Sequence, residues 1–364
     1  MVANNSTILF EFIEQIDTPY RIINDENHII YMNKKMMLLF GNLLGEQADI
    51  IFTNEDSISH YTPRSGKRTR TVQIYIGEAL YKVTSYHVKS KGKEYIVETF
   101  NDITEQKRTE AQLKNSYNKL LKDTKFARSI QYSVLPIDDI YWGMIKLNAT
   151  YLPADDLGGD MFDIVKLNED EMLMYMADVS GHGIRAALLT IFLREVVRGM
   201  ADIARSQGLD QLLESLLKHY TSLDIDAEMY FSIVLCKYNR NTKELSLANA
   251  GHNCFPLVLR KNGRIEEVPI KGMPITKIGI STGYDEETVG IYPGDRILLY
   301  TDGIIEEFSE TEDKEFGVEG VRRASEKYFD LPGDELSKKI IQEAEKFSRT
   351  KAKDDRSIMV ATIL

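Results

Sequence analysis

The chain has 364 residues, only two cysteines and no excess of positive charge. Cys236 and Cys254 are not at metal-ligand spacing, so we exclude a zinc site or a disulfide framework built on them and expect core residues. Lys and Arg total 45 against 56 for Asp and Glu, a net charge of -11, which argues against a nucleic-acid partner that needs a basic face. An acidic chain can still hold a phosphoryl group if metal ions supply the positive charge.

Signals for export and for membrane insertion are also missing. Residues 1–18 lack a basic start followed by an apolar core, and the longest apolar runs are far too short to span a bilayer. We therefore expect a soluble, cytoplasmic protein without membrane insertion. The length is enough for about two domains and a connector.

Short alternating segments fill the first hundred residues. Asp25-Glu-Asn27 separates two apolar runs, as in a hairpin, and later runs alternate apolar and polar residues as half-buried strands do. The pattern predicts helices over 8–16 and 33–41 and strands over 20–24, 28–32, 69–76, 79–88 and 94–102.

Residues 1–104 resemble a PAS sensor domain. The resemblance rests on residues 19–23, the hairpin, Tyr31-Met-Asn33 and the closing Phe100-Asn-Asp-Ile-Thr-Glu105. It implies a small sensory or dimerising module and leaves the PAS ligand unknown. The stretch has no cysteine, which excludes the light-driven flavin adduct of some PAS relatives. Three histidines, His28, His60 and His87, could ligate haem or could be ordinary surface or core residues.

A helical linker is expected over residues 105–138. Residues 103–134 contain neither proline nor glycine, and Pro136 ends the pattern. Alternating steps of three and four residues give a heptad seam with an apolar middle at Leu113, Tyr117 and Leu120 and with polar interruptions. The seam predicts a parallel coiled coil and hence a homodimer. The alternative is a single solvated helix that packs on its own domain.

Beyond Tyr141 the pattern changes to strands mixed with longer helices. The strands cluster and the helices lie in blocks between them, which favours an α+β sandwich over a regular βαβ alternation. The pattern predicts strands over 171–177, 229–236, 244–249, 295–300 and 357–363 and helices over 184–205, 210–222, 317–328 and 334–348.

Acidic residues stand at the ends of four expected strands, at Asp160, Asp178, Asp302 and the pair Asp354-Asp355. Asp178 lies between an apolar strand and a glycine-broken turn that leads into a helix, so it could hold a cation or could cap that helix. A single such aspartate is usually a turn residue. Four of them suggest a converging cluster that needs cations, and ligands that are all oxygen favour Mg²⁺ or Mn²⁺ over zinc.

Five motifs resemble the SpoIIE/RsbU-like branch of the PPM (2C-type) metal-dependent serine/threonine protein phosphatases. They are residues 152–164, 177–183, 248–252, 300–306 and 354–357. Ile130-Gln131 and Leu135-Pro136 match the lead-in of that branch, so the resemblance covers about residues 126–364. It implies a phosphatase domain over 139–364 with an αββα sandwich fold.

Site roles follow from this resemblance. Asp178 would bridge two metal ions, Mn²⁺ or Mg²⁺, with the carbonyl of Val179 as a further ligand. Asp302 and Asp354 would complete one metal and Asp160 would serve the other. The catalytic residues would be Asp178, Asp302 and Asp354, and the ions would activate water to attack a phosphoserine or phosphothreonine. The implied substrate is a STAS-domain anti-sigma-factor antagonist of a bacterial partner-switching pathway.

Some positions depart from the eukaryotic members of the family. Ser180 replaces their histidine two residues beyond the bridging aspartate, and His182 either takes over as proton donor or has no chemistry. Their phosphate-binding arginine is not identifiable, because Arg185 is near the site in sequence but is equally compatible with a surface residue. His252 matches a family motif, yet its loop could be purely structural.

Two other classes of function compete with the phosphatase. One is a phosphatase fold that has lost catalysis and acts as a binding module, although the presence of all four acids argues against it. The other is a diguanylate cyclase, suggested by Gly158-Gly-Asp160, but its signature needs a glutamate where this chain has Met161.

Overall fold

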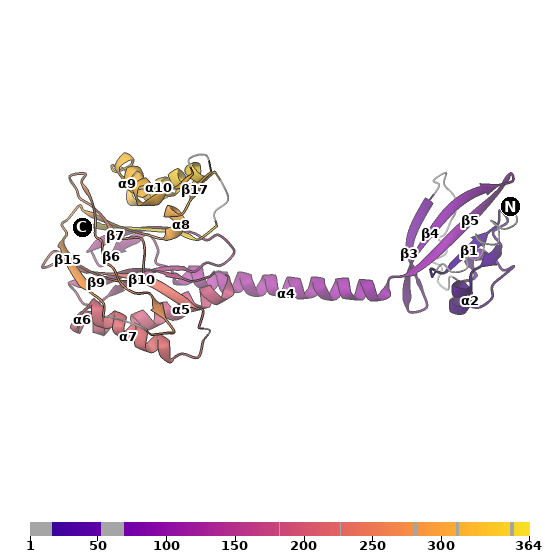
Figure 1. Cartoon of the computed structure of the whole chain (residues 1–364), viewed down its shortest axis with the longest axis horizontal. Coiled ribbons are helices and arrows are strands. Elements are labelled where there is room, and N and C mark those ends of the chain that lie inside the picture. Colours follow the sequence, from indigo (N-terminus) through magenta and orange to yellow (C-terminus); the bar gives the residue numbers. More distant parts are fainter. Residues whose placement is uncertain are drawn as a thin grey trace. The chain divides into compact units, whose positions relative to one another are not determined.

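The computed structural model describes residues 17–51, 69–181, 183–225, 227–279, 283–310, 313–349 and 353–364. The helix expected over 8–16, together with His60 and His182, lies outside these residues. The chain divides into two compact units, residues 1–119 and 120–364, and the division falls inside the long helix α4 (Thr104–Val134), drawn in magenta in Figure 1.

The N-terminal unit contains one antiparallel sheet in the strand order β2-β1-β5-β4-β3. Its elements are β1 (Tyr20–Ile23), β2 (Ile29–Met32), α2 (Lys34–Phe40), η1 (Ala48–Ile51), β3 (Thr69–Ile76), β4 (Ala79–Ser90) and β5 (Lys93–Asp102). Helix α2 begins after Asn33, whose side chain accepts a hydrogen bond from the Met36 amide, and it ends at Gly41. These elements confirm the strands and the second helix expected from the sequence. The PAS assignment of this unit stays a prediction.

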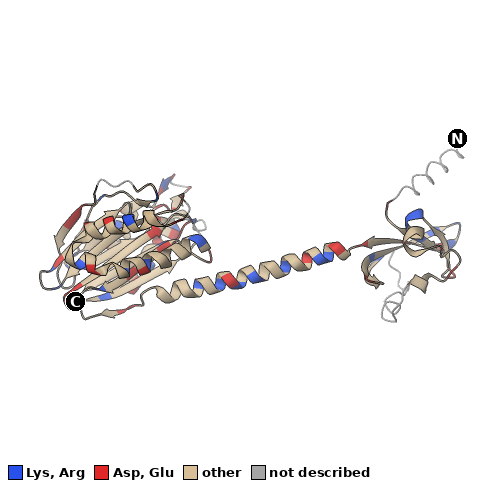
Figure 2. Ribbon diagram, turned by 90° about the horizontal axis from the view of Figure 1, so that it is seen from below, with Lys and Arg blue, Asp and Glu red and all other residues tan. Residues whose placement is uncertain are grey.

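Helix α4 confirms the single long helix expected between the two regions. Acidic and basic residues are both distributed along it (Figure 2). The apolar middle of the seam faces solvent, since Leu113 is 71% exposed and Leu120 is 57% exposed. The middle of the helix therefore does not pack on its own domain, whereas its last turns do, because Gln131 is fully buried. Whether the seam pairs with a second copy stays a prediction.

Four layers make up the C-terminal unit, with two sheets between two layers of helices (Figure 1). The first sheet has the order β15-β11-β10-β9-β8 and the second β13-β12-β16-β19-β7-β6, and all neighbours are antiparallel. The first contains β8 (Asp160–Lys166), β9 (Glu171–Val179), β10 (Tyr230–Asn239), β11 (Glu244–Ala250) and β15 (Glu286–Gly290), with β14 (Ile275–Thr276) paired to β10. The second contains β6 (Asp139–Tyr141), β7 (Ile145–Leu152), β12 (Leu257–Leu259), β13 (Ile265–Glu267), β16 (Arg296–Tyr300) and β19 (Arg356–Ile363).

Apolar side chains fill the three interfaces between these layers. One core lies between the first sheet and its helices, a second between the two sheets and a third between the second sheet and its helices. The first sheet is covered by α5 (Ile184–Gly199), α6 (Ala201–Ser206) and α7 (Leu209–Ser222). Near the second lie α8 (Asp302–Ile305), the hairpin β17 (Phe308–Ser309) and β18 (Lys314–Glu315), α9 (Gly317–Lys327) and α10 (Gly333–Ser348). This arrangement agrees with the expected sandwich.

One element differs from the sequence prediction. The helix expected over 184–205 is two helices, α5 and α6, separated at Met200. Gly199 precedes the break, and glycine weakens a helix because it has the most backbone freedom to lose. Both cysteines are buried, as expected.

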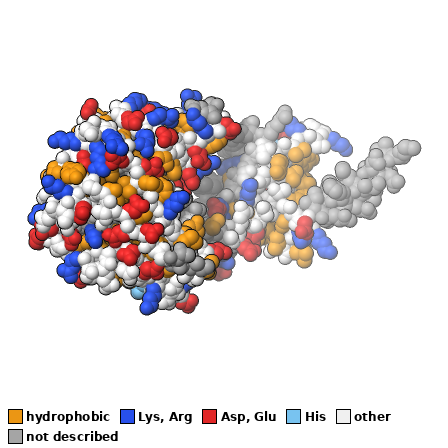
Figure 3. All heavy atoms as spheres, turned by 60° about the vertical axis from the view of Figure 1, so that its left-hand side comes forward, with side chains coloured by type: hydrophobic (Ala, Val, Ile, Leu, Met, Phe, Trp, Pro, Cys, Tyr) orange, Lys and Arg blue, Asp and Glu red, His pale blue; other side chains and the backbone are white. Residues whose placement is uncertain are grey.

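The surface and the helices agree with the composition. Acidic and basic side chains are intermixed over the face of the C-terminal unit that Figure 3 shows. In the described part of the chain, no helix combines the length and the apolar character needed to cross a bilayer.

Candidate metal centre

The acidic residues singled out in the sequence lie where the two sheets of the C-terminal unit meet. Asp160 begins β8 and is the register partner of Asp178, near the end of β9. Asp302 follows β16, and Asp354 precedes β19, the strand that pairs with β16. Hydrogen bonds join the two sheets at this end, because the hydroxyls of Thr301 and Ser357 donate to Oδ2 of Asp160 at 2.8 and 2.6 Å.

Burial and the charges of neighbouring carboxylates shift the pKa values of these residues. Burial, followed by the charges of Asp302 and Asp354, raises the pKa of Asp178 to about 8. Burial, then Asp354 and Glu306, raises the pKa of Asp302 to about 6. Burial and the charge of Asp178 raise the pKa of Asp160 well above its ordinary value. The structure therefore brings Asp160, Asp178, Asp302 and Asp354 into one acidic cluster.

This donor set suits a hard divalent cation. The cluster offers only oxygen atoms, which Mg²⁺ and Mn²⁺ prefer, and a cation would remove the repulsion that raises the pKa values. Among the residues that the structure describes, no three histidine, cysteine or acidic side chains lie close enough together to coordinate one ion.

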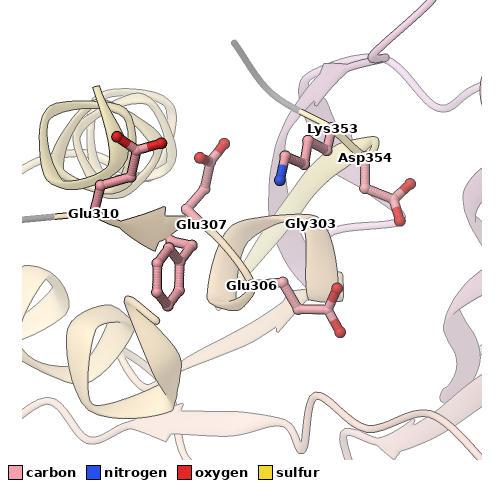
Figure 4. Close-up of a pocket in the computed structure, with 7 residues that line it drawn as sticks. Gly303, Glu306, Glu307, Glu310, Lys353 and Asp354 are labelled. Atoms are coloured by element: carbon pink, nitrogen blue, oxygen red, sulfur yellow. The ribbon is translucent and has the colours of Figure 1, made fainter. Parts of the chain in front are cut away.

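A small cavity of about 190 Å³ lies beside Asp354. Figure 4 shows the side chains that line it, with Glu306 and Asp354 projecting toward the same side. Lining residues are Gly303, Glu306, Glu307, Phe308, Glu310, Lys353 and Asp354. The sequence analysis gave Glu306 no role, although it comes four residues after Asp302. A spacing of four places both on one face of a helical turn, and this was the available signal.

The neighbouring Asp355 is a structural residue. It is buried, and its carboxylate accepts hydrogen bonds from the amides of Ala154 at 2.7 Å and Gly159 at 2.5 Å. These bonds attach the loop before β8 to the segment before β19. Asp354 is exposed, and after burial and the charge of Asp302 both acids of the pair add to the raised pKa of Asp178.

Close packing explains the glycine pair at 158–159. A Cβ atom at Gly159 would lie 2.4 Å from the carbonyl oxygen of Val179, and one at Gly158 would lie 2.4 Å from Oδ2 of Asp355. A side chain at Gly159 would require the backbone at Val179 to move, and one at Gly158 would require the side chains of Tyr151 and Asp355 to move. The two glycines thus have a packing reason in this fold, and the cyclase alternative is not needed to explain them.

Several alternatives left open by the sequence can be decided. Asp178 does not cap the helix that follows, because the residue before α5 is Gly183 and no side chain caps that helix. The Ser180 hydroxyl accepts a hydrogen bond from the Tyr230 amide at 2.9 Å, and this bond extends the pairing of β9 with β10. Arg185 is exposed in the first turn of α5, and its exposure is compatible with both interpretations of this residue.

His252 is a buried link between the two sheets. Its Nε2 lies 3.0 Å from the carbonyl oxygen of Tyr300, and its Nδ1 lies 3.0 Å from the hydroxyl oxygen of Ser232. A carbonyl only accepts, so Nε2 carries the proton and the Ser232 hydroxyl donates to Nδ1. Burial lowers the pKa of His252 to about 4, so the ring is neutral. The structural interpretation of its loop is therefore favoured.

Comparisons with known proteins agree with this fold. The chain aligns with the SiaA-PP2C domain of Pseudomonas aeruginosa at a TM-score of 0.57 and 18% identity, over 68% of this chain and 99% of that one. The C-terminal unit thus has the fold of a PP2C-type domain. The family model described as Stage II sporulation protein E (SpoIIE) matches residues 168–364, and the chain belongs to the SpoIIE family.

Two curated relatives come from Bacillus subtilis (strain 168). The chain is 23% identical to phosphoserine phosphatase RsbU over 250 residues, which cover 68% of this chain and 72% of RsbU. It is 23% identical to phosphoserine phosphatase RsbP over 190 residues, which cover 51% of this chain and 45% of RsbP. The match therefore spans less than half the length of RsbP.

Proposed function

We propose that this chain is a metal-dependent protein serine/threonine phosphatase. The observation that carries the proposal is the meeting of Asp178, Asp302 and Asp354 at one end of the two sheets, where each carboxylate raises the pKa of a neighbour. The similarity to RsbU and RsbP, both named phosphoserine phosphatases, supports it.

The residues of the cluster would coordinate two Mn²⁺ or Mg²⁺ ions. Asp178 would hold both ions, and the carbonyl of Val179 would be a further ligand. Asp302 and Asp354 would complete one site, and Asp160 would serve the other. Oδ2 of Asp160 already accepts two hydroxyl hydrogen bonds, which leaves Oδ1 for an ion. When bound, such ions lower the pKa of water and neutralise charge on phosphoryl oxygens. Thr301 and Ser357 keep Asp160 in place.

The remaining parts of the chain would control and direct this activity. The N-terminal unit would be a PAS sensor, α4 would form a coiled coil in a homodimer, and the protein would act in the cytoplasm. The substrate would be a phosphorylated STAS-domain anti-sigma-factor antagonist of a partner-switching pathway. Similarity to RsbU supports this part of the proposal, together with the exposed seam of α4.

Phosphate release by the full chain tests the activity. With Mn²⁺ present we expect hydrolysis of p-nitrophenyl phosphate and of a phosphoserine peptide, and with EDTA we expect none. A folded chain that binds Mn²⁺ in calorimetry and releases no phosphate from either compound would instead be a binding module with a phosphatase fold.

A further inference from the structure

An apolar groove runs along α5 of the C-terminal unit. Its volume is about 420 Å³, and its walls come from one face of α5 and from Leu223, Ile225 and Met229, which follow α7 and precede β10. Lining residues are Arg185, Leu188, Leu189, Phe192, Leu223, Ile225 and Met229. All but Arg185 are apolar, and two of the apolar side chains reach solvent, with Leu188 59% exposed and Ile225 38% exposed.

Contacts on both walls position the residues that line the groove. The Phe192 ring stacks on His219 with the ring centres 5.9 Å apart. The Lys277 ammonium donates to the carbonyls of Thr221, at 3.1 Å, and Leu223 at the end of α7. The Tyr220 hydroxyl donates to the carbonyl of Met229 at 2.9 Å. A site that is already ordered loses little conformational entropy when it binds.

The groove begins where the turn after Asp178 ends. Ser180 and Tyr230 exchange hydrogen bonds in both directions, which fixes Met229 beside that turn. Helix α5 begins directly after Gly183, and Arg185 is the second residue of its first turn. The cationic end of the groove is therefore the end nearer to the acidic cluster, and the apolar walls extend away from it along α5.

We propose that this groove docks an apolar segment of the phosphoprotein substrate, next to its phosphorylated residue. The inference rests on the proposed phosphatase function and adds a recognition surface to it. Charge complementarity selects this occupant, because a segment with apolar side chains and a phosphate at one end matches apolar walls that end at Arg185. Binding energy from such remote contacts lets an enzyme select one phosphoprotein among many phosphate esters.

Two phosphoserine peptides test the inference on the full chain. One carries leucines three, four and seven residues from the phosphoserine, the spacing of an amphipathic helix, and the other carries glutamines there. Fluorescence anisotropy should show that the chain binds the leucine peptide about tenfold more tightly. Leu188→Ser combined with Ile225→Ser should remove the preference. Arg185→Gln should reduce the difference between the phosphorylated and unphosphorylated leucine peptides.

Ile140→Ser is the matched control. Ile140 is 55% exposed and lies in β6, at the edge of the other sheet, so this variant should keep the preference. Equal binding of both peptides by the unchanged chain would overturn the inference. The inference would also be overturned if the Leu188→Ser, Ile225→Ser variant still preferred the leucine peptide and showed a changed oligomeric state in sedimentation. The groove would then be a contact between two copies of the chain. Failure to hydrolyse p-nitrophenyl phosphate would contradict the phosphatase function and would leave the peptide-binding result unaffected.

Discussion

The aspartates of this site belong to two environments, one among other carboxylates and one among backbone amides. Burial, followed by the charges of neighbouring carboxylates, raises the pKa values of Asp178 and Asp302, and a bound cation would offset both effects. Asp355 instead accepts backbone hydrogen bonds that join two distant segments. Asp160 combines both situations, because hydroxyls from the second sheet bind one oxygen while Asp178 lies opposite it.

Replacing Asp178 by asparagine should abolish phosphatase activity and leave the fold intact. Asparagine keeps the size and removes the charge that would hold two divalent ions together. Phosphate release from a phosphoserine peptide, measured against Mn²⁺ concentration, should fall by more than the roughly hundredfold that an outer-shell substitution can cost. Asp302→Asn and Asp354→Asn should be similarly damaging, and high Mn²⁺ should partly rescue Asp160→Asn.

Asp170→Asn is the control for this series. Asp170 pairs with Arg240 at 3.0 Å on the surface, and an exposed ion pair contributes only about 0–1 kcal/mol. This variant should turn over at the wild-type rate. Circular dichroism checks that each protein is folded. Wild-type turnover by a folded Asp178→Asn variant would refute the two-metal site and with it the phosphatase assignment.

The raised pKa values also predict how stability depends on pH. The folded protein keeps the protons of Asp178 and Asp302 to a higher pH than the unfolded chain does. In EDTA the contribution of these two carboxylates to the free energy of unfolding should therefore fall as pH rises from about 4 to about 8. Mn²⁺ should restore more stability near pH 8 than near pH 6, because ions bind the deprotonated carboxylates.

Thermal unfolding measures this difference. We expect Mn²⁺ to raise the melting temperature by at least about 3 °C near pH 8, and by less near pH 6. Asp178→Asn should lose most of the Mn²⁺ effect, and Asp170→Asn should keep it. An equal Mn²⁺ effect at both pH values would show that these carboxylates do not receive the ion.

At the scale of elements, the last turns of α4 contact the loop that leads to Asp160. The buried Gln131 amide donates to the carbonyl of Gly158 at 2.7 Å and to the Thr190 hydroxyl of α5 at 3.3 Å. One side chain of the linker helix thus contacts the glycine pair before β8 and the helix after the Asp178 turn. A change in how α4 packs could favour one arrangement of the catalytic unit over another.

Insertions into α4 test this route of control. One residue added near Lys122 rotates the preceding part of the helix by about 100 degrees relative to the docked end. Inserting one, two or three residues should change the turnover of a phosphoserine peptide several-fold. A seven-residue insertion adds about two full turns and should restore it. If none of the four insertions changes turnover, the linker is only a tether.

At the scale of the whole molecule, the exposed seam of α4 predicts a dimer. Leu113→Glu with Leu120→Glu would place like charges along the seam, and sedimentation should show monomers. Lys114→Glu with Lys122→Glu adds the same two glutamates off the seam and should remain dimeric. If the seam variant stays fully dimeric, α4 is not the dimer interface.

Much of this protein follows from its sequence alone. The strands over 69–76 and 357–363, the long helix without proline or glycine and the helix between Asn33 and Gly41 all express local periods and caps, which depend on neighbouring residues. The acids at strand ends, such as Asp178, were recognisable for the same reason. In an antiparallel pair, the end of one strand and the beginning of the next lie at the same edge of the sheet, as Asp178 and Asp160 do.

Only the tertiary structure decided what depends on residues far apart in the chain. Asp354 and Asp355 are neighbours in sequence, yet one is exposed beside the acidic cluster and the other is buried against the amide of Gly159, 196 residues away. His252 became a structural residue because it lies between Ser232 and Tyr300, which come from different sheets. Burial, pKa shifts and long-range hydrogen bonds are set by packing between distant segments, and local patterns carry no record of that packing.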